Sequence, residues 1–127
     1  KTLQISNRSA DKVTSLINEL AAAQRIEQVA WGDAGAARAD IIINATSLSL
    51  HQTLPPLPDH LWRAARVCYD MMYQSEDTVF VAHARQHGVA LALDGLGMLV
   101  EQAAEAFYVW HQQRPLTAPV IEQLRAG

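Results

Sequence analysis

Five short runs of strand-like composition recur along this chain, and this recurrence restricts the possible folds more than any other feature. The runs cover residues 2–7, 26–31, 40–46, 66–73 and 89–93. The first alternates apolar and polar residues, whereas "DIIINAT" and "RVCYDMMY" are apolar along most of their length, as in strands covered on both faces. Helix-like segments stand between several of these runs. Strands that alternate with helices predict an α/β fold with a parallel, doubly wound sheet.

The predicted helices are marked by apolar periodicity and by end signals. Residues 9–24 form an amphipathic pattern with Ser9 as the predicted cap, and residues 77–88 end at a glycine. The longest helix is predicted from about residue 97 to 112, and a small helix with Pro119 near its start closes the chain. On the longest helix, spacing predicts a core stripe of Leu99, Ala103, Ala106, Phe107 and Trp110. Residues 48–60 contain three prolines and are predicted to be an irregular surface connection.

Composition limits the possible partners of the chain. Its 127 residues, half of them hydrophobic, suit one globular domain spanning residues 1–127. A net charge of −3 offers no overall attraction for nucleic acid or an anionic membrane, so neither is a predicted partner. No apolar run is long enough to span a membrane. Cys68 is the only cysteine, which excludes an internal disulfide and fits a reducing cytoplasm.

Histidine spacing provides one candidate metal site. His83 and His87 are four residues apart, as two ligands on one helix face would be. No carboxylate or cysteine completes the ligand set. The sequence therefore predicts no metal.

The segment "SNRSADK" places two cations where a helix begins. Arg8 and Lys12 fall in the first helical turn, directly after the first strand. The helix macrodipole disfavours cations there by about 0.3–1 kcal/mol each, so the pair suggests that an anion binds nearby. In a dinucleotide-binding fold an arginine at this position meets the 2′-phosphate of NADP. On spacing alone, two solvated surface cations partly offset by Asp11 remain an equal alternative.

The glycines of "GDAGAARAD" resemble a phosphate-binding loop, but their position argues against it. Such a loop follows a strand and opens a helix. Here a strand-like run begins almost at once after residues 32–40. A linker is the favoured interpretation.

Four motifs together resemble one family. "SNRSADK", "ADIIINATS", "YDMMY" and "DGLGMLVEQAAEAFYVWH" are similar, in order and approximate spacing, to the carboxyl-terminal NADP-binding half of shikimate dehydrogenase. The resemblance extends from the first residues to about Arg114. It implies a Rossmann-like domain of an NADP-dependent oxidoreductase that interconverts 3-dehydroshikimate and shikimate in the chorismate pathway to aromatic amino acids.

The resemblance also implies roles for individual residues. Those that would bind NADP are Asn7, Arg8, Ser9, Lys12, Thr46, Met71 and Gly95. Those that would bind shikimate or 3-dehydroshikimate are Tyr73 and Gln102. A polyhydroxylated acid suits an amide such as Gln102, which can donate and accept hydrogen bonds. From the helix pattern alone, an amide at the edge of the core that bonds to backbone is an equal possibility.

The resemblance further implies that parts of the family's enzyme lie outside this chain. They are the substrate domain with its catalytic Lys and Asp, the first strand of the nucleotide fold and its glycine-rich loop. No catalytic residue is therefore assigned here, and we expect no dehydrogenase turnover from the chain alone. In the strand order 3-2-1-4-5-6 the first strand is central. We expect either direct pairing of the strand of Leu3 and Ile5 with "DIIINAT", or a homodimer that fills the gap.

Two other functions remain open. A quinate/shikimate dehydrogenase paralogue that prefers NAD is one, although Arg8 and Lys12 favour NADP. The other is a noncatalytic binding or assembly module derived from the enzyme. Its support is the absent half and Ser49, which stands where family sequences usually have glycine.

Overall fold

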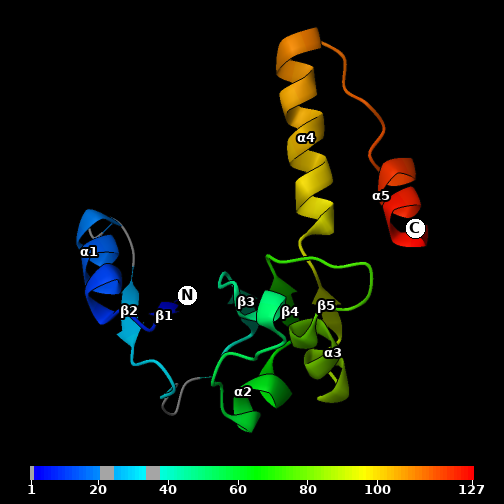
Figure 1. Ribbon diagram of the computed structural model, residues 1–127. Helices are drawn as coiled ribbons and strands as arrows, with labels where there is room; N and C mark the ends of the chain where they lie inside the picture. The colour runs from blue at the N-terminus through cyan, green and yellow to red at the C-terminus, as the bar shows by residue number, and fades with distance from the viewer. Residues whose placement is uncertain (1, 21–24, 34–37) are drawn as a thin grey trace.

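The computed structural model describes residues 2–20, 25–33 and 38–127, arranged as short strands and helices (Figure 1). The amino-terminal elements are β1 (Leu3–Ser6), α1 (Ala10–Leu20) and β2 (Ile26–Val29). The elements that follow are β3 (Ile41–Asn44), the 3-10 helix η1 (Leu48–His51), α2 (Asp59–Ala64), β4 (Val67–Asp70), α3 (Val79–Gln86), β5 (Leu91–Leu93), α4 (Leu96–His111) and α5 (Ala118–Ala126).

The strands form two sheets, and every strand pair is parallel. One sheet pairs β1 with β2, and the other has the order β3-β4-β5. The predicted α/β fold with parallel strands is therefore confirmed. Among the described residues, no strand of one sheet is hydrogen-bonded to a strand of the other.

The predicted direct pairing of β1 with β3 is wrong. Among the described residues β1 pairs with β2, and β3 pairs with β4. Each sheet packs with helices of its own: α1 contacts β1 and β2, whereas α3 contacts β4 and β5.

The main core lies on one face of the β3-β4-β5 sheet. Helices α2 and α3 cover it with Trp62, Phe80, Val81 and Ala84, which pack with Cys68 and Ala92 of the strands. The opposite face is open: Ile41 and Ile43 of β3 are 59% and 61% exposed. The prediction that "DIIINAT" is covered on both faces is wrong for the described residues. An apolar run indicates a strand that can be covered on both faces, but the helix that would cover the second face is not among the described elements.

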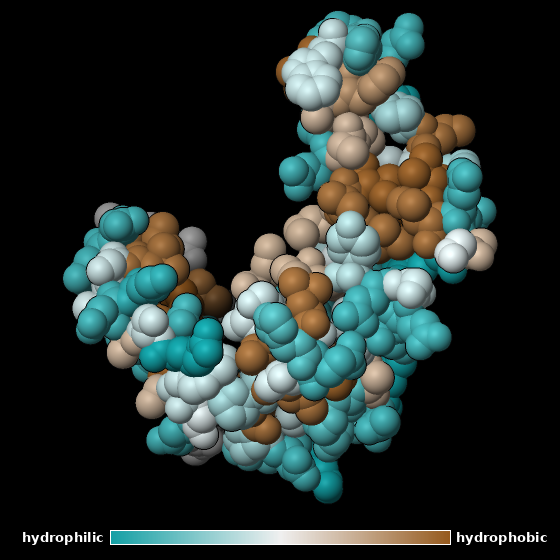
Figure 2. Space-filling model, in the orientation of Figure 1, coloured by the Kyte–Doolittle hydropathy of each residue, from teal (hydrophilic) through white to brown (hydrophobic). Residues whose placement is uncertain are grey.

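Helix α4 projects away from the sheet, with α5 beside it (Figure 1). Its buried residues are Leu96, Val100 and Ala104. The predicted stripe of Leu99, Ala103, Ala106, Phe107 and Trp110 is wrong as a core: Phe107 is 41% and Trp110 77% exposed. Periodicity identifies the apolar residues, but the helix extends past the elements that would cover them. A broad hydrophobic surface is visible around α4 and α5 in Figure 2.

Several predicted boundaries are confirmed and two details differ. Gly88, with φ of +78°, follows α3, and Pro119 stands in the first turn of α5. Residues 48–60 are less irregular than predicted, because they include η1 and the start of α2. At the start of α1 the side-chain hydrogen bond comes from Asn7 rather than Ser9, since Asn7 Oδ1 accepts from the backbone N of Ser9 at 3.0 Å. Residues 34–37 of the predicted linker and 21–24 of the predicted first helix lie outside the described residues.

Candidate functional site

The carboxyl ends of β3, β4 and β5 bring three loops together. The backbone N of Met71 donates to the carbonyl of Asn44 at 2.9 Å, which joins the loops after β4 and β3. The backbone N of Gly95 donates to the carbonyl of Met72 at 3.0 Å, which joins the loop after β5. Parallel sheets bind ligands at this edge, where successive strands deliver their loops. It is the candidate site.

Four of the residues singled out in the sequence lie on these loops. Thr46 is half-buried, Met71 and Tyr73 are 36% and 47% exposed, and Gly95 is buried. A Cβ added to Gly95 would stand 2.2 Å from the carbonyl oxygen of Met71. Gly95 is therefore required for the close packing of two loops, a reason that is independent of any cofactor.

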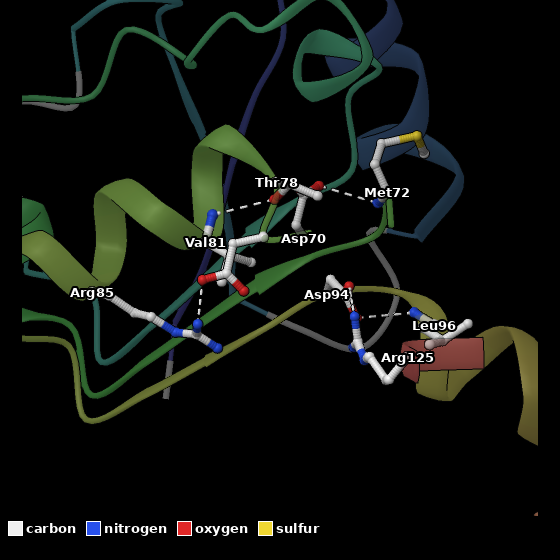
Figure 3. Close-up of polar contacts among 9 residues, drawn as sticks. Asp70, Met72, Thr78, Val81, Arg85, Asp94, Leu96 and Arg125 are labelled. Atoms are coloured by element: carbon white, nitrogen blue, oxygen red, sulfur yellow. Dashed lines mark hydrogen bonds and ion pairs between the residues drawn. The ribbon is translucent and has the colours of Figure 1, made fainter. Parts of the chain in front are cut away.

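A buried carboxylate lies beneath these loops (Figure 3). Asp70 ends β4, and its side chain is fully buried. Its Oδ2 accepts from the hydroxyls of Ser49 at 2.5 Å and Thr78 at 2.7 Å. Its Oδ1 accepts from the Asn44 amide at 3.1 Å and from the backbone N of Met72 at 3.1 Å. Four donors compensate the loss of water around the carboxylate.

A second buried carboxylate fixes the start of α4. Asp94 accepts from the backbone N of Leu96 at 3.2 Å, and the guanidinium of Arg125 in α5 binds both of its oxygens. The hydrogen bond with Asp94 raises the pKa of Arg125. The pair attaches α5 to the loop that carries Gly95 (Figure 3).

Gln102 lies on α4, the helix that begins directly after Gly95. Its side chain is exposed, as is its neighbour Met98. No side-chain hydrogen bond of Gln102 occurs within the described part of the chain, so the backbone-bonded amide considered from the sequence is not found there. The amide is available to a ligand.

The cationic cluster lies in the other sheet's unit. Asn7, Arg8, Ser9 and Lys12 are exposed at the junction of β1 and α1. In residues 2–20, 25–33 and 38–127, neither the Arg8 nor the Lys12 side chain has an ion-pair partner. A hollow of about 460 Å³ on α1 includes Lys12, but Asp11 and Glu19 also line it, which makes it a poor site for an anion.

The structure thus gathers Thr46, Met71, Tyr73 and Gly95 at one edge and leaves the Arg8 cluster on a separate unit. No hydrogen bond or ion pair between described residues joins the two groups. Figure 2 shows a hollow between the unit of β1, α1 and β2 and the rest of the surface. A ligand that reached both groups would have to be long.

Sequence reasoning missed Asp70 as the buried anchor of these loops, and it missed the hydroxyls of Ser49 and Thr78 that donate to it. The available signal was a polar residue directly after an apolar run, as in "IIIN" and "VCYD". Such residues fall at the carboxyl ends of strands. Parallel register then places Asn44 beside Asp70.

The remaining candidates carry no comparable arrangement. Burial raises the pKa of the Cys68 thiol to about 11, which makes it a poor nucleophile. The rings of His83 and His87 lie 4.3 Å apart. In the described ranges no three residues of metal-binding type are grouped to hold an ion, and no helix is long and apolar enough to cross a membrane.

Parallel strands with polar loops at their carboxyl ends define the class of the chain, an α/β fold of the nucleotide-binding kind. The predicted resemblance to shikimate dehydrogenase is confirmed within that class. Residues 95–125 match the family described as the Shikimate 5′-dehydrogenase C-terminal domain.

Curated relatives extend the similarity over nearly the whole chain. The chain is 49% identical to the NADP(+) shikimate dehydrogenase of Cellvibrio japonicus, over 95% of its own length and 44% of the relative. It is 50% identical to that of Chromohalobacter salexigens, over 97% and 45%. The chain therefore spans less than half the length of these relatives.

Solved structures show the same similarity. An Ael1 enzyme from Pseudomonas putida superimposes with a TM-score of 0.86 at 42% identity, covering 97% of this chain and 45% of that one. Shikimate 5-dehydrogenase from Thermus thermophilus, solved with NADP(H) and shikimate, gives a TM-score of 0.75 at 27% identity over 97% and 45%.

Proposed function

We propose that this chain is the cofactor-binding half of an NADP-dependent shikimate dehydrogenase, which reduces 3-dehydroshikimate to shikimate. The observation that carries the proposal is the meeting of Thr46, Met71, Tyr73 and Gly95 at the carboxyl edge of β3, β4 and β5. The sequence similarity to NADP(+) shikimate dehydrogenases supports it. The cytoplasm is the proposed location, as a single buried cysteine suggests.

The residues present fit NADP at two places. Arg8 and Lys12 are exposed cations without an ion-pair partner in the described residues, and with Asn7 and Ser9 they are proposed to hold the 2′-phosphate. Thr46, Met71 and Gly95 are proposed to border the nicotinamide. NADP, when bound, supplies the hydride chemistry, while the protein supplies position and electrostatics.

The substrate contacts are proposed to come from Tyr73 and Gln102. Tyr73 lies on the loop after β4 and Gln102 on α4; both side chains are exposed, and both carry groups that hydrogen-bond to hydroxyls. They would orient the ring acid toward the nicotinamide side of the site. We assign no proton-transferring residue to this chain, and we propose that a Lys and an Asp of the substrate domain take that role. The isolated chain should then show no turnover.

The experiment that tests this proposal compares NADP⁺ with NAD⁺ on the full-length enzyme. Removing one charge-assisted contact to the 2′-phosphate costs about 1.4 kcal/mol or more, so Arg8→Ala should weaken NADP⁺ binding about tenfold. NAD⁺ has no 2′-phosphate, so its affinity should not change. Arg63→Ala is the control, because Arg63 lies on α2 and pairs only at 3.8 Å with Asp59, both side chains being 72% exposed.

Three results would count against the proposal. If Arg8→Ala weakened the binding of NADP⁺ and NAD⁺ equally, the assignment of Arg8 to the 2′-phosphate would be wrong. A wild-type enzyme that prefers NAD⁺ would favour the quinate/shikimate paralogue. Shikimate oxidation that does not depend on Gln102 would argue against the substrate assignment.

A second candidate function, an assembly module, is favoured by the open edges. The facing edges of β1 and β3 are without a strand partner among the described residues, and Ile41 and Ile43 are exposed beside them. We propose that a strand fills this position, from the rest of the full-length enzyme or, in the isolated chain, from a second copy in a homodimer. Ser49 no longer supports a noncatalytic role, since its hydroxyl is part of the buried hydrogen-bond network of Asp70.

A further inference from the structure

We infer that Asp70 is a positioning residue for the nicotinamide side of the proposed site, a step that rests on the proposed function. Its carboxylate is fully buried, and its four donors come from four different parts of the chain. They are the end of β3, the 3-10 helix η1, the loop after β4 and the residue that caps α3. One side chain thus fixes the relative position of the elements around two of the site's loops.

From Asp70 a continuous path leads to Thr46. The Asn44 amide nitrogen donates to Asp70 at 3.1 Å and to the Ser49 hydroxyl at 3.2 Å. This leaves the amide oxygen of Asn44 facing Thr46, where it accepts from the backbone N at 3.1 Å and from the hydroxyl at 2.7 Å. Asp70 therefore decides which way the Asn44 amide points, and Asn44 orients Thr46.

A second path leads to Met71 and Gly95. Asp70 accepts from the backbone N of Met72, which bends the chain directly after β4. The carbonyl of Met72 accepts from the N of Gly95 at 3.0 Å, and the carbonyl of Met71 lies where a Cβ of Gly95 would be. Three residues proposed to border the nicotinamide, Thr46, Met71 and Gly95, are thus held through one carboxylate.

The four donors around residue 70 require a side chain with two acceptor oxygens. An asparagine has the same shape but replaces one oxygen with an NH₂ group. That group would face two donors, and a buried donor without an acceptor is unfavourable. In Asp70→Asn either the Ser49 and Thr78 hydroxyls or the Asn44 amide and Met72 N–H lose their acceptor, so the loops lose their common anchor.

Asp70 could instead act only on overall stability, and Thr78 distinguishes the two roles. Ser49 and Thr78 both donate to Oδ2 of Asp70, and both are fully buried. Ser49 belongs to the loop after β3, whereas Thr78 caps α3 by accepting from the N of Val81. Thr78→Val should therefore lower the melting temperature at least as much as Ser49→Ala, yet leave the site's loops in place.

The experiment measures shikimate oxidation by the full-length enzyme, together with the Kd of adenosine 2′,5′-bisphosphate. This probe carries the 2′-phosphate but no nicotinamide, so it tests the adenosine end of the cofactor site, where Arg8 is proposed to bind. For Asp70→Asn we expect kcat/KM for NADP⁺ to fall at least about tenfold, while the Kd of the probe is unchanged. Ser49→Ala should give a smaller loss of the same kind, and Thr78→Val should change the melting temperature alone.

The outcomes separate this inference from the proposed function. The positioning role would be overturned if Ser49→Ala and Thr78→Val lowered kcat/KM equally, while the wild-type enzyme binds the probe and oxidises shikimate. The positioning role would also be overturned if Asp70→Asn weakened binding of the probe by the same factor as it lowered kcat/KM. If Asp70→Asn does not fold, the contrast between Ser49→Ala and Thr78→Val decides. A wild-type enzyme that neither binds the probe nor oxidises shikimate would overturn the proposed function itself.

Discussion

Replacing Gly95 with alanine tests the close packing of the two loops at the candidate site. The new Cβ would stand 2.2 Å from the carbonyl oxygen of Met71 and 2.8 Å from its carbonyl carbon. Because these are backbone atoms, relief requires the loop after β4 or the start of α4 to move. The hydrogen bonds Met71 N to Asn44 O and Gly95 N to Met72 O oppose that movement. Overpacking of this kind costs about 1–3 kcal/mol, and with the weakened hydrogen bonds we expect the free energy of unfolding to fall by about 2 kcal/mol.

The measurement is urea unfolding of the chain, monitored by circular dichroism. In thermal unfolding of the same chain, a loss of about 2 kcal/mol lowers Tm by about 5–10 °C for a chain of this size. Gly97→Ala is a matched control two residues further along, because a Cβ there meets no atom within 4 Å. Alanine is favoured over glycine inside a helix by about 1 kcal/mol, so Gly97→Ala should raise stability. If Gly95→Ala unfolded at the same urea concentration as the wild type, the close approach of the loops would be refuted.

Three further predictions follow from the described contacts. Arg125→Ala should lower the free energy of unfolding by about 2 kcal/mol, because it removes charge-assisted bonds to the buried Asp94. Arg85→Ala, which removes the exposed ion pair with Asp77, should lower it by less than about 1 kcal/mol. Equal losses of the two variants in urea unfolding would contradict this. Burial and the nearby His87 lower the pKa of His83, so its contribution to stability is present above pH 6.5 and is lost as the pH falls. His83→Gln should reduce that loss in urea titrations below pH 6.5, and an unchanged pH dependence would argue against it. Light scattering of the isolated chain should give a mass above one chain of 14.0 kDa, and a stable monomer would contradict the homodimer.

Local patterns predicted the type of most elements but not their surroundings. Residues 79–86 and 96–111 are helices, as the spacing of apolar residues and the glycine ends indicate. The same spacing wrongly assigned Leu99, Phe107 and Trp110 to a core, because a helix can present an apolar face that nothing in the described chain covers. Periodicity reports which face is apolar, and burial depends on what packs against it.

The candidate site was predictable in part, for a comparable reason. Residues that follow an apolar strand lie at its carboxyl edge whatever the rest of the fold does, so Thr46, Met71 and Gly95 could be expected near one another once the strands are parallel. The role of Asp70 could not be predicted, because its bonds to Asn44 and Ser49 span 26 and 21 residues. They depend on the register that pairs β3 with β4, which no local pattern specifies.

The sequence by itself determined an α/β chain of parallel strands, the approximate positions of most of its helices and the edge at which polar loops collect, since these depend on neighbours a few residues apart. Only the tertiary structure decided that the strands form two sheets with an open position between β1 and β3, and that one face of β3-β4-β5 is uncovered. It also decided that one buried carboxylate joins the loops of the site. These features depend on contacts between distant segments, whose free energy is settled by packing and register rather than by local preference.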